Sequence, residues 1–276
     1  MGAEAQGRMS IRNIAANVFT GKLEKFSNRH EGETCYIFGD GPSIKWFDFS
    51  EFSNHPAICC GMIPFHKDFD KLDVRYIALV EPWLFVPKIF QPKILHCLRQ
   101  IAAEYKCRIA SLPDKEFFVS LSNLFSLSGK NINYVYRNLP NSRNQTDMDL
   151  NQFDCFGGSF HASLSLAYYM GFKKIYLVGF DAWTIQPART LRWYELGDGE
   201  YFNPTNFALE YLKVLKQEID IYTISKDGKS CNVKNISYAS FTGKQPEYTE
   251  NYELLSGHML KVLGTCHEYK IISTGN

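Results

Sequence analysis

The stretch Thr34-Cys35-Tyr36-Ile37-Phe38-Gly39-Asp40-Gly41-Pro42-Ser43 joins an apolar run to a glycine-bearing turn. Its first five residues are typical of a buried strand, and a helical turn is expected to follow. Gly39 and Gly41 permit a tight turn and a close approach of a ligand to the backbone. Pro42 suits the first position of a helix. Ser43 and the free N–H groups of the first turn could then bind an anion. The loop is therefore interpreted as a nucleotide site or as a purely structural strand-to-helix turn.

Further short apolar runs predict more strands, and apolar residues at helical spacing predict helices between them. Strands are expected at 57–60, 76–80, 107–112, 174–178 and 219–224, and helices at 10–19, 92–105, 159–170, 207–217 and 252–262. The alternation favours an α/β fold with a Rossmann-like, mostly parallel sheet flanked by helices. In such sheets ligands bind at the carboxyl ends of strands, where the strand order reverses. We expect an N-terminal extension with a short helix (1–29) and a single α/β nucleotide-binding domain (30–276).

The composition is that of an ordinary globular protein, with 276 residues, 45% hydrophobic residues and a formal net charge of +1. This charge creates no overall attraction to nucleic acid. The eight cysteines form no C-x-x-C pair, and no apolar run or leader-like segment indicates a membrane span or a secretory signal. We therefore expect a cytoplasmic protein. The short helix at 10–19 is flanked by basic residues, which leaves open a peripheral contact with the inner face of the membrane. Assembly into a homo-oligomer is also left open.

Two later segments repeat the chemistry of the first turn. Gly157-Gly158-Ser159 opens a predicted helix, where it either exposes amides to an anion or serves as a plain N-cap. Asp181 and Trp183 follow the strand that ends at Val178. Asp181 could accept a ribose hydroxyl and Trp183 could stack on a ring, unless both belong to an ordinary loop.

The phrases Tyr36–Ile44 and Gly171–Asp181 resemble those of the bacterial, Campylobacter-type sialyltransferases. They also resemble related pterin-diphosphokinase-like proteins that share the GxGPS motif. The resemblance covers roughly residues 34–225 and is strongest at 157–181. It implies a CMP-linked donor, no metal or other cofactor, and a lid at about 184–206. The nucleotide-binding residues that we predict are Gly39, Asp40, Gly41, Pro42, Ser43, Gly158, Ser159, Asp181 and Trp183.

The chain departs from the family pattern at several functional positions. The family has Asn where this sequence has Asp40, and the tyrosines that support its leaving phosphate correspond to Trp183 and Arg189. Its catalytic histidine corresponds to Glu200, and an asparagine of its donor site to Glu81. Glycosyl transfer needs a base for the acceptor hydroxyl and a cation for the leaving phosphate. We therefore predict catalytic roles for Glu200, Arg189 and Glu81, with Asp198 as a further base and Arg192 as a further cation. Glu200 could also be a solvated loop carboxylate.

The leading hypothesis is a glycosyltransferase that moves a sugar from a nucleotide-sugar donor to a glycan acceptor on the bacterial surface, as in lipopolysaccharide or capsule biosynthesis. One alternative is a diphosphotransferase of the pterin-diphosphokinase type, which would need ATP and magnesium. Another is a non-catalytic nucleotide-binding module. The triplet Asp147-Met148-Asp149 resembles a metal-binding D-x-D, but such a triplet is frequent by chance in a polar loop.

Overall fold

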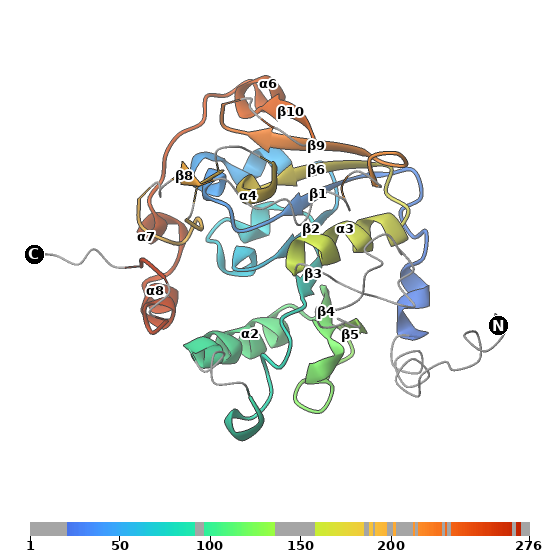
Figure 1. The fold of residues 1–276 in the computed structure, drawn as a ribbon, viewed down its shortest axis with the longest axis vertical. Helices are drawn as coiled ribbons and strands as arrows, with labels where there is room; N and C mark the ends of the chain where they lie inside the picture. Colours follow the sequence, from blue (N-terminus) through green and yellow to red (C-terminus); the bar gives the residue numbers. More distant parts are fainter. Residues whose placement is uncertain are drawn as a thin grey trace, which may run out of the picture.

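The fold is a twisted parallel sheet with helices on both faces (Figure 1). The computed structural model describes residues 21–91, 97–135, 158–184, 188–189, 191–197, 201–202, 212, 215–227, 230, 233–266 and 269–271. The strands of the sheet are β1 (Thr34–Phe38), β2 (Ala57–Cys60), β3 (Val74–Leu79), β4 (Glu116–Ser120), β5 (Ile132–Val135), β6 (Lys174–Val178), β9 (Asp220–Ser225) and β10 (Lys234–Ser237). Their order is β10-β9-β6-β1-β2-β3-β4-β5, and every neighbouring pair is parallel. The predicted α/β class and parallel sheet are confirmed.

The helices connect the strands and cover the sheet. The α-helices are α2 (Arg99–Ser111), α3 (Ser159–Tyr169), α4 (Asp181–Thr184), α6 (Tyr238–Thr242), α7 (Asn251–Leu254) and α8 (Gly257–Gly264). The 3-10 helices are η1 (Gly21–Phe26), η2 (Pro42–Trp46), η3 (Phe49–Phe52), η4 (Ile63–Phe65), η5 (Phe69–Lys71), η6 (Lys88–Phe90) and η8 (Leu121–Asn123). A separate antiparallel ribbon pairs β7 (Ala188–Arg189) with β8 (Tyr201–Phe202), inside the segment predicted to form a lid.

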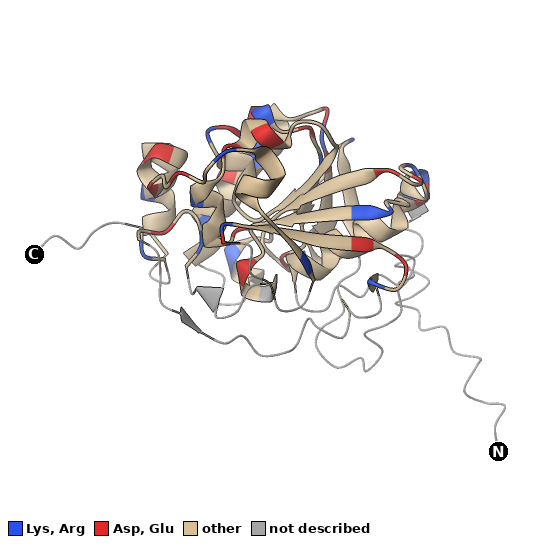
Figure 2. Ribbon diagram, turned by 90° about the horizontal axis from the view of Figure 1, so that it is seen from above, with Lys and Arg blue, Asp and Glu red and all other residues tan. Residues whose placement is uncertain are grey.

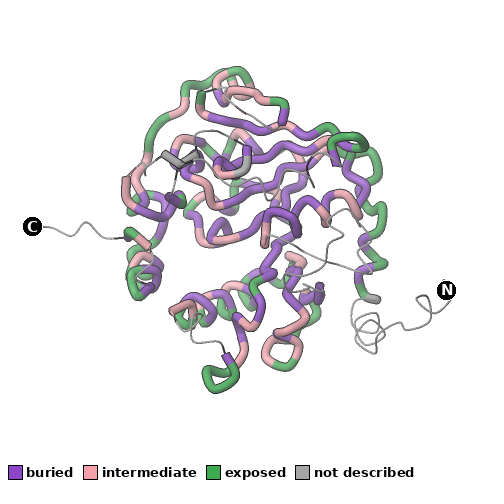
Figure 3. Tube along the Cα trace, viewed as in Figure 1, coloured by how far each residue is buried: buried purple, intermediate pink, exposed green. Residues whose placement is uncertain are grey.

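The core lies on both faces of the sheet, because successive side chains of each strand point to opposite sides. In β1, Tyr36 and Phe38 belong to one apolar cluster, and Cys35 and Ile37 belong to the other. The helix α3 packs over β1, β2 and β3 on the second face. The strands are buried along almost their whole length, and exposed residues gather in the connections (Figure 3). Burial of both faces explains why the strands read as continuous apolar runs.

Two expectations about secondary structure are wrong. Residues 107–112, expected as a strand, form the end of α2 and its C-cap, because Ile109 continues the buried helical stripe of Ile101 and Tyr105. The helix expected at 252–262 is divided into α7 and α8, since Ser256 caps a new helix by accepting the N–H of Met259. Strands β4, β5 and β10 were not predicted. The helices expected at 10–19 and, for the most part, at 207–217 lie outside the described residues.

Basic and acidic residues are interspersed over the described surface (Figure 2). Within the described ranges, no helix has the length and hydropathy needed to cross a bilayer.

Candidate functional site

The strand order reverses between β1 and β6. From β1 the chain adds β2, β3, β4 and β5 on one side, and it returns through α3 to place β6 on the other side of β1. The connections that leave the carboxyl ends of β1 and β6 therefore run in opposite directions. A crevice at such a reversal is the usual ligand position in a parallel sheet. Gly39 and Gly179, which directly follow these two strands, both lie at this edge, called here the switch edge.

The two turns at the switch edge pack directly on each other. A Cβ atom on Gly39 would lie 2.7 Å from the ring of Phe180, and one on Gly41 would lie 2.1 Å from Oδ2 of Asp181. Gly179 has a φ of +73°, and its carbonyl oxygen lies 2.6 Å from the same Cβ position on Gly41. These glycines are thus required by contact between the two turns, independently of any ligand.

The backbone amides of the first turn already have partners in the protein. Gly39 N–H donates to the carbonyl of Val178 at 2.9 Å, and Gly41 N–H donates to the carbonyl of Gly179 at 2.6 Å. The N–H of Ser43 donates to Oδ2 of Asp181 at 3.0 Å. Asp181 therefore supplies the anion at the start of η2, where Pro42 holds the first position. The Oγ of Ser43 is buried and forms no hydrogen bond within the described residues, so it has hydrogen-bonding capacity that these residues do not use.

Asp40 connects three segments rather than facing outward. Its carboxylate accepts the N–H of Met62 at 2.9 Å and Nε1–H of Trp193 at 3.0 Å. The backbone N–H of Trp193 also donates to the Asp40 carbonyl at 3.0 Å. A Cβ atom on Gly61, whose φ is +57°, would lie 1.8 Å from Oδ2 of Asp40. Burial raises the pKa of Asp40 to about 6, although the hydrogen bonds from Met62 and Trp193 oppose the shift. Asp40 thus joins the ends of β1 and β2 to the segment 191–197.

The start of α3 lies beside the same two turns. Phe160, in the first turn of α3, packs against Phe180 with 4.8 Å between ring centroids. Gly158 is the N-cap, with a φ of +91°, and Ser159 is the first helical residue. The amino end of an eleven-residue helix carries partial positive charge and favours an anion. The sequence motifs at 39–43, 158–159 and 179–181 are therefore brought together.

The predicted catalytic residues are described only in part. Glu81 follows β3 and is exposed, and its carbonyl accepts Nδ2–H of Asn123 at 3.1 Å. The backbone of Arg189 lies in β7, opposite Tyr201 of β8. Trp183 lies in α4, and the side chains of Trp183 and Arg189 are outside the described set. Glu200, Asp198, Gly157 and the triplet 147–149 also fall outside it.

Arg192, a further cation predicted from the sequence, lies near enough to Asp40 for its charge to act on that carboxylate. Its Nη1 lies 3.6 Å from Oε2 of Glu195, and its guanidinium lies over the ring of Tyr269 at 4.9 Å from the centroid. Its side chain remains 45% exposed, so it can also contact a ligand. Arg192 precedes Trp193, and the hydrogen bond from Trp193 to Asp40 ties this part of the chain to the end of β1.

The sequence reasoning did not single out His66. The imidazole stacks on Phe49 at 4.1 Å and lies 5.1 Å from the ring of Trp193. Its Nδ1 accepts the N–H of Asp68 at 3.1 Å, which leaves the proton of the neutral ring on Nε2. Burial lowers the pKa of His66 to about 4. His66 is therefore neutral at pH 7 and cannot serve there as a base through Nδ1. In the sequence, the signal that could have pointed to His66 was its position a few residues after an apolar strand.

Comparison with known proteins gives no match to a family model and no match among curated sequences. Solved structures with a similar arrangement include sialyltransferases. One is sialyltransferase CST-II in complex with trisaccharide acceptor and CMP, which is 14% identical, with 85% of this chain and 100% of that chain covered and a TM-score of 0.42. A second is CstII from Campylobacter jejuni with the substrate analogue CMP-3FNeuAc, which is 12% identical, with coverages of 84% and 99% and a TM-score of 0.40. A third is the apo α-2,3-sialyltransferase from Campylobacter jejuni, which is 14% identical, with coverages of 80% and 86% and a TM-score of 0.38. Identities and TM-scores of this size assign no activity to this chain.

Proposed function

We propose that the chain is a glycosyltransferase that uses a nucleotide-activated sugar and binds the donor at the switch edge. The supporting observation is the strand-order reversal between β1 and β6, which gathers the turns after both strands and the start of α3 at one edge. A crevice with a helix amino end beside it suits the phosphate of a nucleotide. The preference for a CMP-linked acidic sugar, and for a surface glycan such as lipopolysaccharide or capsule as acceptor, rests on the sequence resemblance.

The geometry changes the proposed roles of the first motif. Asp40 and Asp181 hold the turns through Met62, Trp193 and Ser43, so they act as positioning residues for the donor site. The groups left for the donor are the Ser43 hydroxyl and the helix start at Gly158 and Ser159.

The catalytic roles follow from what the transfer requires. The acceptor hydroxyl must lose its proton to a base, and the leaving phosphate must be stabilised by positive charge. We assign the base to Glu200, with Glu81 and Asp198 as substitutes, and the cations to Arg189 and Arg192.

Thermal unfolding with nucleotides tests the donor site. A ligand at 100 times its Kd stabilises the native state by about 2.7 kcal/mol, which for a chain of this size raises the Tm by roughly 5–10 °C. We expect this shift with CMP or CDP without metal. A shift only with ATP and magnesium would replace the proposal by the diphosphotransferase. Absence of any shift with CMP, CDP, UDP, GDP and ATP would refute the nucleotide site.

A serine pair localises the binding. Ser43→Ala removes a hydroxyl that lacks a hydrogen bond within the described structure, so the Tm of the unliganded protein should hardly change. The shift produced by CMP should become smaller. Ser163→Ala, a buried change further along α3, is the control and should retain the full shift. Equal CMP shifts in both variants would remove Ser43 from the site.

We also propose a peripheral contact with the inner face of the membrane, supported by three apolar side chains on two neighbouring loops. Ile89 is 83% exposed, Phe90 71% and Phe125 99%. The bases of the loops are joined, because Trp83 N–H donates to Oγ of Ser122 at 2.9 Å. Both loops lie at the lower end of the molecule in Figures 1 and 3. Apolar side chains at protruding positions can enter the headgroup region of a bilayer.

Vesicle sedimentation tests this contact. The variant Ile89→Ser, Phe90→Ser, Phe125→Ser should lose binding to vesicles of phosphatidylethanolamine and phosphatidylglycerol. Tyr252→Ser, which removes a side chain that is 63% exposed elsewhere, should bind like the parent protein. Undiminished binding by the triple variant would contradict the proposal. Homo-oligomer formation remains a prediction, to be tested by light scattering.

A further inference from the structure

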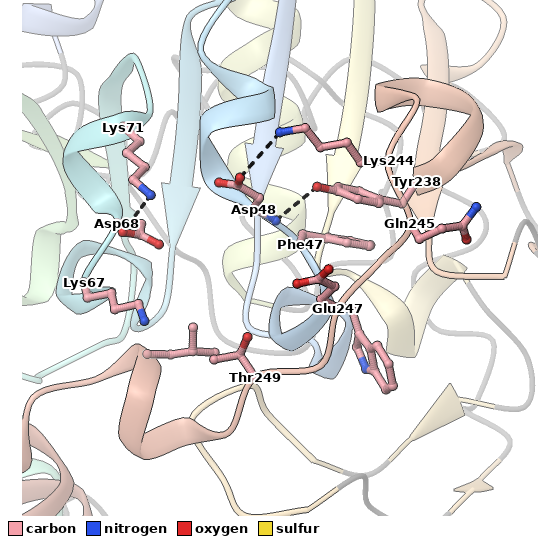
Figure 4. Close-up of a pocket in the computed structure, with 12 residues that line it drawn as sticks. Phe47, Asp48, Lys67, Asp68, Lys71, Tyr238, Lys244, Gln245, Glu247 and Thr249 are labelled. Atoms are coloured by element: carbon pink, nitrogen blue, oxygen red, sulfur yellow. Dashed lines mark hydrogen bonds and ion pairs between the residues drawn. The ribbon is translucent and has the colours of Figure 1, made fainter.

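A polar cavity of about 600 Å³ (Figure 4) is lined in part by Phe47, Tyr238 and Leu254, which belong to the apolar cluster on the sheet face opposite α3. It is formed by residues that follow the carboxyl ends of three strands. Phe47 and Asp48 come after η2, Lys67 lies between η4 and η5, and Lys244 follows α6. None of its lining residues belongs to the switch edge. Its volume is within the range typical of sites for small molecules.

One wall of the cavity is rigid and apolar. Phe47 stacks on Tyr238 with 4.7 Å between ring centroids and an interplanar angle of 9°. Both rings are buried, and the hydroxyl of Tyr238 accepts the N–H of Asp48 at 3.2 Å. This fixed wall holds the backbone of Asp48, so the position of its carboxylate beside the cavity is defined before a ligand binds.

The polar part of the lining carries equal numbers of opposite charges. The lysines are Lys67, Lys71 and Lys244, and the carboxylates are Asp48, Asp68 and Glu247. The formal charge of the lining is therefore zero, and it has no excess of cations to attract a phosphate or carboxylate ligand. At the same time it offers strong donors and strong acceptors at several points of one cavity (Figure 4).

Part of this hydrogen-bonding capacity is not used within the described part of the chain. Nζ of Lys244 donates one hydrogen bond, to Oε1 of Glu51, and lies 3.9 Å from Oδ2 of Asp48, which is too long for a second one, so the other donors of this ammonium are not taken by Asp48. Lys67 forms no ion pair within the described residues, and Lys71 pairs with Asp68 at 3.1 Å. Thr249 donates its backbone N–H to the carbonyl of Lys45, which leaves its side-chain hydroxyl at the cavity.

We infer that this cavity binds an uncharged saccharide. A sugar hydroxyl donates one hydrogen bond and accepts others, whereas an ammonium group only donates and a carboxylate only accepts. A hydroxyl placed between Asp48 and Lys244 satisfies both, and Lys67 with Thr249 offers a second such position. The apolar C–H face of the sugar can rest against the wall of Phe47. The inference does not depend on the proposed transferase activity, because the lining residues have no role in it.

Saturation-transfer NMR with methyl glucoside, lactose and maltose tests the inference on the full chain. We expect transfer from the protein to at least one of these neutral sugars. The variant Asp48→Asn, Lys67→Gln should bind it at least about tenfold more weakly, a change that corresponds to about 1.4 kcal/mol. Asn can replace Asp48 as the N-cap of η3, where the side chain accepts the N–H of Ser50 at 2.9 Å, so the local fold is kept.

The matched control is Asp220→Asn, Lys234→Gln, which makes the same changes in an exposed pair on β9 and β10. Its binding should equal that of the parent protein. Three results would overturn the inference: no transfer to any neutral sugar, equal binding by the Asp48 and Lys67 variant, or displacement of the sugar by inorganic phosphate. Failure of nucleotide binding at the switch edge would leave this inference intact. Failure of sugar binding in the cavity would likewise leave the proposed nucleotide site intact.

Discussion

Replacement of Asp40 by Asn should change how the stability of the protein depends on pH. Asp40 titrates near 6 in the folded chain because it is buried, and near 3.9 when unfolded. The native state therefore binds this proton more tightly than the unfolded state, by about 3 kcal/mol. Where the folded pKa is raised, protonation adds stability, so this contribution grows as the pH falls from about 6 to 4 and is lost as the pH rises.

His66 acts in the opposite direction. Its pKa is about 4 in the folded chain and about 6.5 when unfolded, so the unfolded state binds this proton more tightly, again by about 3 kcal/mol. Stability from a neutral buried histidine is present above pH 6.5 and is lost as the pH falls toward 4. The two contributions nearly cancel in the parent protein between pH 4 and 6.5. Asp40→Asn removes the contribution of Asp40 and leaves that of His66 uncompensated.

Urea unfolding at 25 °C between pH 4 and 7.5 measures the effect. The free energy of unfolding of Asp40→Asn minus that of the parent should rise by about 3 kcal/mol from pH 4 to pH 7.5. Met62 N–H and Trp193 Nε1–H both donate to Oδ1, which Asn retains, and Asp40 is protonated at pH 4.5, so the variant should there differ least from the parent in its hydrogen bonds. Asp220→Asn, at an exposed aspartate whose pKa is lowered by the hydrogen bond from Lys234, should give a flat difference from pH 5 upward. Parallel profiles for Asp40→Asn and the parent would refute the reasoning.

Three further variants test the packing around the same region. Gly41→Ala places a Cβ atom 2.1 Å from Oδ2 of Asp181 and should lower the free energy of unfolding by about 1–3 kcal/mol in urea, while Gly257→Ala, where nothing lies within 4 Å, should change it by less than about 1 kcal/mol. Lys45→Met removes a buried ammonium that donates to the carbonyl of Gly197 at 2.9 Å and pairs with Glu250 at 3.2 Å. It should cost about 3–5 kcal/mol by the same assay, and a loss below 1 kcal/mol would contradict this role. His66→Phe leaves the Asp40 contribution uncompensated, so the stability of this variant should rise as the pH falls from 6.5 to 4, measured as the urea midpoint at each pH; a profile parallel to that of the parent would show that His66 does not titrate as inferred.

The sequence predicted the architecture where strands were long and apolar. Strand 34–38 was expected with the observed bounds, and the alternation of strands and helices was sufficient to predict a parallel sheet. Prediction of secondary structure from the sequence failed where the apolar pattern was short or fitted both a helix and a strand. Glu116–Ser120 and Ile132–Val135 became strands because the sheet extends to them. Residues 107–112 are an apolar run that also continues the buried stripe of α2. Packing of that stripe on the core stabilises a helix there instead of the expected strand.

For the candidate site, the sequence located the turns but did not reveal their partners. The glycines at 39 and 41 were identified as permissive of ligand approach, whereas the structure shows them packed against Phe180 and Asp181. Pairing of Asp40 with Trp193 joins residues far apart in the chain. Such a contact has no local signature, because it depends on how two separate loops meet after the sheet has formed. The proposed roles of Glu200 and Arg189 stay predictions.

The central position of β1 has a consequence for synthesis on the ribosome. One edge of β1 is covered by β2 soon after the chain emerges, but the other edge pairs only with β6, at Lys174–Val178. At translation rates of about 5–20 residues per second, that edge stays without its partner for roughly 7–28 s. An apolar strand with an open edge is a template for association with other nascent chains. Expression at reduced temperature or with a holdase chaperone should therefore raise the yield of folded protein more than any change at its surface.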